Sequence, residues 1–580
     1  MSMIKKLFEK IFKRQEYTIF LKLGYLLLGS LFFPTFVSSL FLLLNISINI
    51  INFIIGLILL FISYYYLFYD KKNKKEFFIP IIISIIIYLI CLGTTYFLYD
   101  RSSDGMFYHL PAVLKLSEGW NPLYEHFDNQ NILVIWSEHY PKFIWIYGAM
   151  LYQITNNIYS ATIFNHIVTI ASLFITFDII YKITNKKTLS IISSIIITFN
   201  VVLVGQLFTM YNDGVLGLCI ISIILIYLAI TKDIYSLKKS FNPITIILAG
   251  YLSLLCNIKY TGALFAFLLF IIYTIICYWN KKILLDKKFI SYLLIIGLGV
   301  SIISSNTYLP NLIYHKNIGY PIMGKDKIEI IDQFVPEYIN GNSKIIAFIK
   351  SQTHNTYYKE YVYEPPFTLN YGDYLCSSSY DCRDRGFSPL FQLIMISITI
   401  IVIYELIKII INKNTKKEFN KFIKKYQIEL ISFGVMFLFF IITPATWWSR
   451  YIPYIYTIPI LIIILFNIDL RKLNITSYLT ITIIIIYSVT LVINYRINLL
   501  KTIEYTNEYK NELLVLENES KNNHIDIETI DKVNQGKDVV LNNELTKRGI
   551  DYTRNNYNNC KIKQELSYLD INLLDCSKER

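Results

Sequence analysis

The sequence predicts an all-α polytopic membrane protein with about thirteen transmembrane helices. Of its 580 residues, 54% are hydrophobic and 17% are charged, whereas soluble domains average about 25% charged residues. Apolar stretches close to the roughly 20 residues that cross a bilayer recur over residues 1–495. Lys and Arg gather in alternate connections between these stretches, as is typical of cytoplasmic loops.

The predicted spans follow one another closely, and so many of near-spanning length leave little room for a soluble core of apolar strands. They lie at residues 23–44, 48–69, 77–98, 157–181, 188–207, 214–231, 243–258, 261–279, 289–306, 389–411, 428–446, 452–468 and 474–494. The first span follows a basic N-terminus, but it is longer than the apolar region of a signal peptide and further spans follow it. We therefore expect it to be a retained anchor.

The basic connections predict the orientation of the chain. After the basic N-terminus, Lys and Arg gather at residues 71–75, 182–187, 232–239, 281–288, 413–425 and 471–472, which lie in every second connection. This pattern predicts a multi-pass protein of the inner (plasma) membrane, with a cytoplasmic N-terminus and an outer C-terminus. It also accounts for the net charge of +13 without a nucleic-acid partner.

Three regions follow from this topology. Residues 1–76 hold the N-terminus and two additional spans, and residues 77–495 form the main transmembrane region, with long outer segments at 99–156 and 307–388. In the first outer segment, the spacing of Phe107, Leu110, Val113 and Leu114 predicts a short amphipathic helix on the membrane. The small polar region 496–580 is expected outside, as a helical cap or partly disordered.

The cysteines fit the same map. Cys91, Cys219, Cys256 and Cys277 fall in or beside spans, where a thiol usually serves as a small apolar filler. The other four lie in outer segments, where an even number allows disulfides, with Cys376–Cys382 and Cys560–Cys576 as the local pairs. Their spacing is not that of a zinc site, so we expect them to stabilise the outer loops.

Charged groups are scarce inside the predicted membrane region. Asp178 and Glu405 are the exceptions, and both lie towards cytoplasmic ends of spans. Ion-coupled transporters usually carry ionisable groups near the bilayer midplane. The scarcity therefore argues against ion-coupled transport.

Polar groups gather instead at the predicted outer boundary. The segment after the third span carries Asp100, Asp104, Tyr108, His109, His139 and Lys142. Taken singly, each of these residues has an equally good interpretation as a solvated side chain near a helix end. As a block they favour a functional site.

Three short outer turns sharpen this interpretation. Lys259 and Arg450 stand in turns that the positive-inside rule should keep poor in cations, and Asp213 is a lone acid in a third turn. Such cations can simply extend to the interface. Placed among aromatic residues at that level, they also suit a lipid phosphate or diphosphate, which we favour.

The order of these elements resembles the GT-C superfamily of membrane glycosyltransferases, in particular the bacterial branch related to protein O-mannosyltransferases and the lipid A aminoarabinose transferase. Asp104 and Tyr108 match that family's Asp-Glu-x-x-Tyr element, with Gly105 in place of the second acid. Lys142 is a shifted match to its Lys-Pro-Pro element, and Asp213 falls where many relatives keep an acid. The Asn306–Asn311, Gly319–Pro321 and Trp448–Tyr451 elements are also similar. The resemblance spans residues 77–495.

The resemblance implies a GT-C-like helix arrangement and a polyprenyl-phosphate-linked sugar as donor, with a glycolipid, polysaccharide or protein as acceptor and membrane lipids around the chain. It implies that Asp104 is the base that deprotonates the acceptor. Lys142, Lys259 and Arg450 would bind the donor phosphate. Asp100 and Asp213 would orient the acceptor or hold a divalent cation, and Tyr108, His109 and His139 would contact sugar or phosphate.

Three alternatives remain at the sequence level. The first is a transporter of polysaccharide or lipid-linked sugar. The second is an O-antigen ligase or polymerase, whose key Arg and His residues lie in a late outer loop, here represented by His315, Lys316, His354, Arg383 and Arg385. The third is a non-enzymatic assembly or sensor protein that binds a partner through its C-terminal region.

Overall fold

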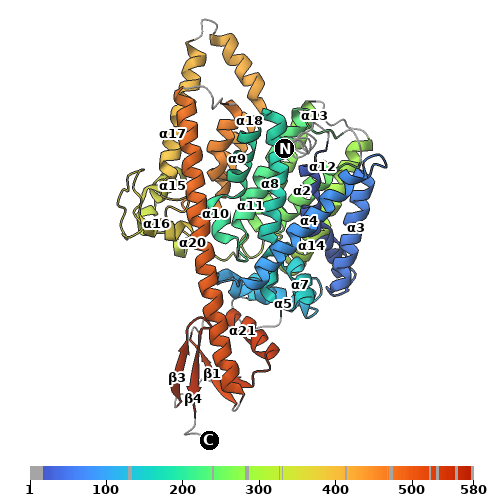
Figure 1. Ribbon diagram of the computed structural model, residues 1–580, viewed down its shortest axis with the longest axis vertical. Coiled ribbons are helices and arrows are strands. Elements are labelled where there is room, and N and C mark those ends of the chain that lie inside the picture. The colour runs from blue at the N-terminus through green and yellow to red at the C-terminus, as the bar shows by residue number, and fades with distance from the viewer. Residues whose placement is uncertain are drawn as a thin grey trace, which may run out of the picture.

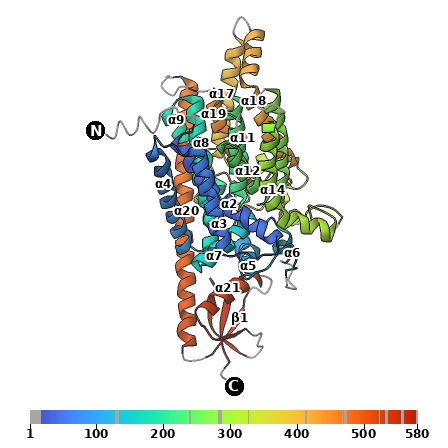
Figure 2. The ribbon, with the colours of Figure 1, turned by 90° about the vertical axis from the view of Figure 1, so that its right-hand side faces the viewer.

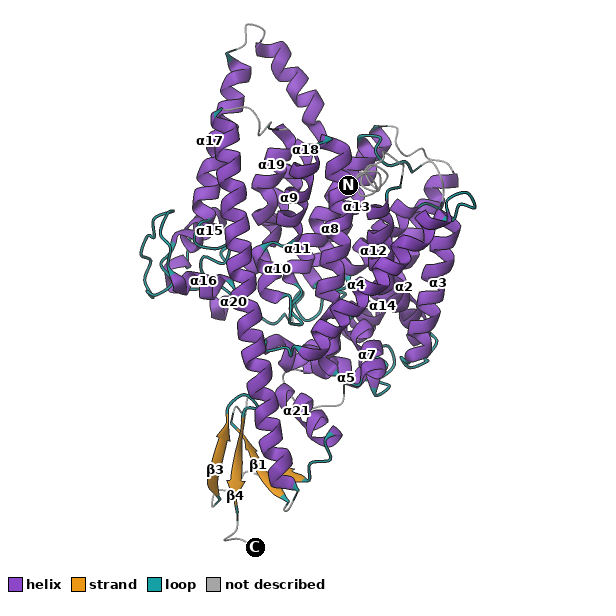
Figure 3. Ribbon diagram, viewed as in Figure 1, coloured by secondary structure: helices purple, strands orange, loops and turns teal. Residues whose placement is uncertain are grey.

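In the computed structural model the chain folds into a helical bundle with a small α/β domain at its C-terminal end (Figure 1). The structure describes residues 17–127, 134–237, 241–280, 287–325, 327–329, 331–411, 415–466, 468, 474–521, 524–530, 535–554 and 560–576. Helices dominate the molecule, and strands occur only in the C-terminal domain of the described chain (Figure 3).

Ten helical segments of the described chain are long and apolar enough to cross a membrane, which fits a multi-pass membrane protein. They are α2 (Ile19–Leu43), α3 (Ile50–Phe68), α4 (Lys74–Phe97), η2 with α8 (Ile158–Thr162 and Ile163–Thr184), α11 (Asp213–Thr231), α13 (Tyr260–Trp279), α14 (Lys287–His315), α17 (Phe391–Ile410), α18 (Thr415–Ile442) and α20 (Ile475–Ser520).

Three predicted spans form shorter helices, so the structure does not establish the predicted number of thirteen. Segment 188–207 divides into α9 (Lys187–Thr198) and α10 (Val201–Gln206), because the Asn200 side chain accepts a hydrogen bond from the Leu203 amide and starts a new helix. Segment 243–258 forms the fourteen-residue α12 (Pro243–Cys256). Segment 452–468 divides into η6 (Pro453–Thr457) and α19 (Ile458–Phe466).

The bundle has a buried centre and a lipid-facing rim. In the most apolar stretches of α2, η2–α8 and α11, 72%, 78% and 94% of residues are buried, whereas only 22% are buried in α3 and in α4. Large apolar side chains of α3 and α4 are exposed, among them Ile62, Ile82 and Ile90. An exposed apolar rim around a buried centre is the arrangement expected where lipid, rather than water, surrounds the helices.

The first long connection packs against the bundle. It contains the π-helical turn η1 (Gly105–His109), α5 (Leu110–Ser117), α6 (Val134–His139) and α7 (Phe143–Thr155). The amphipathic helix expected on the membrane corresponds to α5, but Leu110, Val113 and Leu114 are buried and α5 packs on α7. Its apolar face is therefore covered by protein.

The second long connection contains η3 (Asp332–Phe334), η4 (Glu337–Ile339), α15 (Lys344–Thr353) and α16 (Tyr371–Ser377). It lies beside α20, where the Ser377 hydroxyl donates a hydrogen bond to Asn494 Oδ1 (2.8 Å). The short turn η5 (Ser449–Tyr451) follows α18.

The C-terminal region is a folded α/β domain, which corrects the prediction of an all-α chain with a helical or partly disordered tail. Helix α20 continues out of the bundle through the predicted boundary at 495/496 (Figures 1 and 2). Beyond it lie β1 (Ile525–Thr529), α21 (Gln535–Lys547), β2 (Tyr552–Arg554), β3 (Lys561–Leu566) and β4 (Ile571–Asp575). The sheet order is β2-β1-β4-β3, with β1 and β2 parallel and the other pairs antiparallel.

Both predicted local disulfides are present. Cys376–Cys382 closes a turn after α16, and Cys560–Cys576 joins the residues that precede β3 and follow β4. The four cysteines in or beside spans are free, and Cys91, Cys219 and Cys277 are buried.

Candidate functional site

Six of the nine predicted site residues line one cavity of about 640 Å³. They are Asp104, Tyr108, His109, Asp213, Lys259 and Arg450. The cavity lies where η1, the starts of α11 and α13, and η5 meet. Described residues between 322 and 335 and the turn after α16 complete its wall. Folding thus brings together side chains that are up to 346 positions apart in the sequence, from Asp104 to Arg450.

Arg450 lies between two carboxylates. Its Nη1 is 3.7 Å from Asp104 Oδ2, and its Nε is 3.4 Å from Asp381 Oδ1. The guanidinium also lies over the rings of Trp448 (4.2 Å to the centroid) and Tyr211 (5.0 Å). Such aromatic stacking suits Arg better than Lys and fixes the plane of the guanidinium.

Lys259 and Asp213 form a buried ion pair inside the cavity. Their side chains are 16% and 4% exposed, and Lys259 also lies 4.1 Å from the centroid of the Tyr451 ring. The second Asp213 oxygen accepts a hydrogen bond from Gln206 Nε2 (3.3 Å), and Gln206 Oε1 accepts one from the Gly214 amide (2.8 Å). Gln206, at the end of α10, therefore holds the Asp213 carboxylate towards Lys259.

The electrostatics single out Asp104 as a candidate base. Burial raises the pKa of Asp104, Arg450 lowers it, and the nearby Asp381 and Asp213 carboxylates raise it. Its side chain is 31% exposed because it opens onto the cavity. The Tyr108 hydroxyl lies 3.4 Å from Asp104 Oδ2, and the π-helical turn that starts after Asp104 is a geometry found frequently at functional sites.

His109 enters the cavity wall as a neutral ring. Trp145 Nε1 donates a hydrogen bond to His109 Nδ1 (2.7 Å), and burial lowers the pKa of His109 to about 3. Because an indole nitrogen can only donate, Nδ1 is the acceptor and the proton resides on Nε2. His109 is therefore suited to hydrogen bonding and not to binding as a cation.

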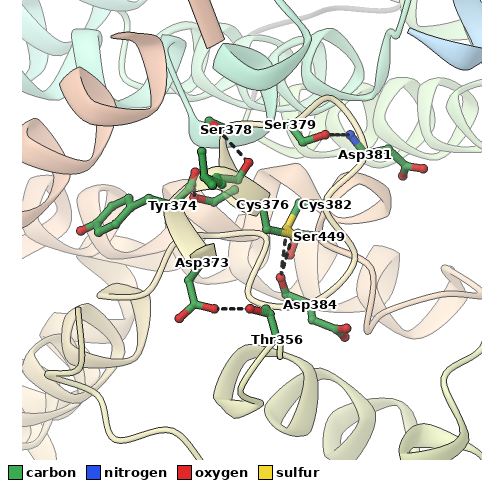
Figure 4. Close-up of a disulfide and its surroundings, with 12 residues drawn as sticks. Thr356, Asp373, Tyr374, Cys376, Ser378, Ser379, Asp381, Cys382, Asp384 and Ser449 are labelled. Atoms are coloured by element: carbon green, nitrogen blue, oxygen red, sulfur yellow. Dashed lines mark hydrogen bonds between the residues drawn. A yellow bond between two sulfur atoms is a disulfide. The ribbon is translucent and has the colours of Figure 1, made fainter. Parts of the chain in front are cut away.

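The turn after α16 supplies two cavity residues that the sequence did not assign to this site, Asp381 and Arg383. The Cys376–Cys382 disulfide closes this turn (Figure 4). Gln206 Nε2 also donates to the carbonyl oxygen of Tyr380 (3.1 Å), which ties the turn to α10. The predicted disulfide was the one sequence signal that this turn is fixed in place.

Arg383 differs from Arg450 in its partners. Its guanidinium lies over the rings of Phe334 (4.6 Å) and Trp448 (5.0 Å). No carboxylate of the described chain forms an ion pair with it. By contrast, Arg385 is fully buried and bonded to Asp373 (2.7 Å) and to the Pro389 carbonyl oxygen (2.9 Å), as a structural residue would be.

Asp100 does not line the cavity but holds its wall. It is fully buried, its Oδ1 accepts a hydrogen bond from the Ser102 amide and its Oδ2 accepts one from the Met210 amide, both at 2.8 Å. Burial raises the pKa of Asp100 to about 6, although these hydrogen bonds oppose the shift. Asp100 therefore links the loop before η1 to the loop before α11.

Lys142 and His139 also lie outside the cavity lining. Lys142 is 1% exposed, and its ammonium donates to the carbonyl oxygens of Glu138 (2.6 Å) and Tyr140 (3.0 Å). Burial lowers the pKa of Lys142 to about 7 and that of His139 to about 4. His139 Nδ1 is 2.7 Å from Asn311 Oδ1, so His139 connects the first long segment to α14, whereas Lys142 stabilises the turn in which it lies.

The described residues contain no group of three or more His, Cys, Asp and Glu side chains placed to hold a metal ion. The cavity carboxylates Asp104, Asp213 and Asp381 instead lie beside Lys259 or Arg450. This donor set does not fit a divalent cation, because each carboxylate already faces a cationic side chain.

An apolar groove of about 550 Å³ adjoins the cavity. It lies between α13 and α14 and is lined by side chains such as Leu264, Phe267, Val300 and Met323. The groove and the cavity share Tyr260, Thr261 and Ile322 as lining residues. A charged compartment and an apolar one thus share a wall at the flank of the membrane helices.

No protein-family model, curated protein or solved structure matches this chain. Its own geometry defines the class of site: a polar cavity with paired acids and cations at the end of membrane helices, next to an apolar groove with which it shares lining residues.

Proposed function

We propose that this chain is a membrane glycosyltransferase that moves a sugar from a polyprenyl-phosphate-linked donor to an acceptor at the outer face of the membrane. The observation that carries the proposal is the junction of the polar cavity with the apolar groove through Tyr260, Thr261 and Ile322. The proposal places the polar head of the substrate in the cavity and its long apolar tail in the groove.

The proposed reaction needs one base. The acceptor hydroxyl attacks the anomeric carbon, its proton passes to a carboxylate oxygen of Asp104, and the bond to the phosphate oxygen of the donor breaks. The bonding electrons leave with the polyprenyl phosphate. The raised pKa of Asp104 makes its carboxylate a stronger base than a solvent-exposed aspartate.

The leaving phosphate gains negative charge in the transition state, so cations nearby lower the barrier. Lys259, Arg450 and Arg383 all line the cavity, and we assign them to this role. The positions of Lys142, His139 and Asp100 support no contact with substrate, and their proposed roles change to holding the site in shape.

The orientation rests on the basic loops. Their alternation favours a cytoplasmic N-terminus, and it assigns the cavity and the C-terminal domain to the outer side of the inner (plasma) membrane. A lipid-linked donor sugar already carries polyprenyl phosphate as its leaving group. The reaction at the outer side of the membrane therefore needs no nucleotide cofactor.

One observation favours a second candidate, a ligase or polymerase of the O-antigen type. Arg383 comes from the late connection 307–388, lines the cavity and pairs with no described carboxylate. An enzyme that loses more activity on substitution of Arg383 than on substitution of Asp104 would belong to that class. A transporter of lipid-linked sugar is the remaining alternative.

The proposal is tested in cells and in vitro together. A strain without this chain should accumulate a lipid-linked sugar and lose one surface glycan, and the wild-type chain but not Asp104→Asn should reverse both changes. Purified chain in nanodiscs should then transfer labelled sugar from the accumulated lipid. Translocation of the lipid without transfer would establish a transporter and contradict the proposal.

A further inference from the structure

A second groove lies on another flank of the bundle, among α4, α8, α9, α10 and α20. Its volume is about 560 Å³, within the range of ligand pockets, and most of its lining is apolar. It shares no lining residue with the polar cavity or with the groove between α13 and α14. It is therefore a separate compartment.

His166 is an unusual side chain within this groove. It lies near the start of α8 and is 9% exposed, and both of its ring nitrogens are buried. Within the described chain, the hydrogen-bonding group that they approach is the Thr162 backbone, one turn earlier. The threonine hydroxyls of the groove are satisfied by their own helices, since Thr94 donates to the Ile90 carbonyl oxygen (2.9 Å) and Thr169 to that of Asn165 (2.5 Å). Because buried polar groups are normally hydrogen-bonded, the ring nitrogen of His166 that does not face Thr162 needs a partner from outside the described chain.

A cation lies in the same lining. Arg496 follows the apolar part of α20, and no carboxylate of the described chain forms an ion pair with it. Tyr495 beside it is 41% exposed. A cation and an aromatic residue at the end of an apolar span are typical of the headgroup level of a bilayer.

The groove opens towards lipid. Ile90 of α4 and Val492 of α20 are 63% and 68% exposed, and both line it. Its walls continue the lipid-facing surface of the membrane helices. A molecule that enters from the bilayer can therefore place a hydrocarbon chain along these walls and its headgroup near Arg496.

We propose that this groove binds one anionic glycerophospholipid. The acyl chain packs on the apolar walls, Arg496 binds the phosphate, and the ring nitrogen of His166 that does not face Thr162 forms a hydrogen bond with the headgroup. Guanidinium groups bind phosphate through paired N–H donors, and basic pockets between membrane helices bind anionic headgroups. Phosphatidylglycerol fits better than phosphatidylcholine, whose choline cation would add a second positive charge beside Arg496.

The test uses the full chain in detergent and phosphatidylglycerol that carries a photoactivatable group in one acyl chain. After illumination, the labelled positions are mapped by mass spectrometry. We expect labels on the groove residues of α4, α8 and α20. In His166→Leu and Arg496→Gln, labelling should fall by about tenfold, the change that corresponds to one lost charge-assisted hydrogen bond.

The control variant is Lys115→Gln, which also removes one cation but acts at an exposed pair with Glu118 and does not line the groove. Its labelling should match the wild type. Thermal unfolding of each variant separates lost binding from lost folding. Unchanged labelling in Arg496→Gln would overturn the proposal. Competition by a lipid-linked sugar, without competition by unlabelled phosphatidylglycerol, would also overturn it. Neither outcome depends on sugar transfer.

Discussion

Nη1 of Arg450 lies 3.7 Å from Oδ2 of Asp104, which is ion-pair distance but longer than a hydrogen bond. The same guanidinium approaches Asp381 to 3.4 Å on its other edge. Arg450 therefore favours the ionised form of Asp104 without donating a hydrogen bond to it. An ionised carboxylate at the edge of the cavity can accept a proton, as a general base must.

Replacing Asp104 by Asn should remove that base. We expect the rate of sugar transfer at saturating donor to fall by about 100- to 10,000-fold, the range typical of general-base catalysis. Donor KM should change little, because the cations that face the phosphate remain. Glu118→Gln, which neutralises an exposed acid of the same connection, serves as control. Full activity in Asp104→Asn would exclude this residue as the base.

The pH dependence of transfer should report the environment of Asp104. Protonation of the Asp104 carboxylate removes the base, so kcat/KM should fall as the pH decreases through the pKa of Asp104. Because burial raises this pKa, the midpoint should lie above the ordinary Asp value of about 3.9. The Asp381 carboxylate also raises the pKa of Asp104. In Asp381→Asn the acid limb of the profile should therefore move to lower pH, and a shift to higher pH would contradict this assignment.

The buried pair of Lys259 and Asp213 should matter for stability as well as for chemistry. Lys259→Met leaves the Asp213 carboxylate uncompensated at 4% exposure, and we expect a loss of about 3–5 kcal/mol in the free energy of unfolding. Lys259→Met combined with Asp213→Asn should lose less, because no unpaired charge remains. Denaturant unfolding in detergent measures the free energy of unfolding of the two single variants and of the double variant. A double variant as unstable as the sum of the single variants would show that the two residues are not coupled.

If Lys142 has a structural role, its contribution to the free energy of unfolding should depend on pH. Burial lowers the pKa of Lys142 to about 7 in the folded chain, from its ordinary value of 10.5. Between these values the unfolded state binds more protons than the folded state, so the contribution of Lys142 to stability should rise with pH from about 7 to about 10.5.

The prediction for Lys142 is checked by measuring the unfolding temperatures of the wild type and of Lys142→Met at pH 6.5 and pH 9.5. The first pH lies below the lowered pKa of Lys142 of about 7, and the second lies above it. The unfolding temperature of the wild type should rise relative to that of Lys142→Met at the higher pH. Donor KM of the folded variant should stay near that of the wild type. A large rise in donor KM with unchanged stability would instead restore the predicted role of Lys142 in phosphate binding.

The sequence predicted features correctly where a run of residues has a characteristic length and hydropathy, or where a residue departs from the positive-inside rule. Spans follow from length and hydropathy, and Lys259 and Arg450 stood out because they break the positive-inside pattern; both line the cavity. Asp381 lies in a polar loop with no such contrast, and only the fold brings it to Arg450. Lys142 resembled a ligand in sequence, but its ammonium bonds to the carbonyl oxygens of its own turn.

The C-terminal sheet escaped prediction for a related reason. Its strands contain three to six residues, too few for a clear alternation of apolar and polar positions. Ile525 and Ile527 of β1 and Ile571 and Leu573 of β4 are buried alternately, but the pattern is recognised only once the strands are paired.

The contact between the C-terminal domain and the proposed active site leads to a last prediction. A Cβ at Gly536, in the first turn of α21, would lie 1.9 Å from the carbonyl oxygen and 2.5 Å from the carbonyl carbon of Phe107. Phe107 belongs to η1 and lines the cavity three positions after Asp104. Any side chain at Gly536 must therefore move α21 or η1.

We expect Gly536→Ala to lower the transfer rate at saturating donor by up to about 100-fold, because a displacement near 1 Å of a positioned catalytic group costs about that much. Gly434→Ala is the matched control, since a Cβ there meets no atom within 4 Å. It should leave the rate unchanged. Thermal unfolding shows whether Gly536→Ala keeps its fold. If that variant folds and transfers sugar at the wild-type rate, α21 does not set the position of Asp104, since a methyl group would then be accommodated without moving η1.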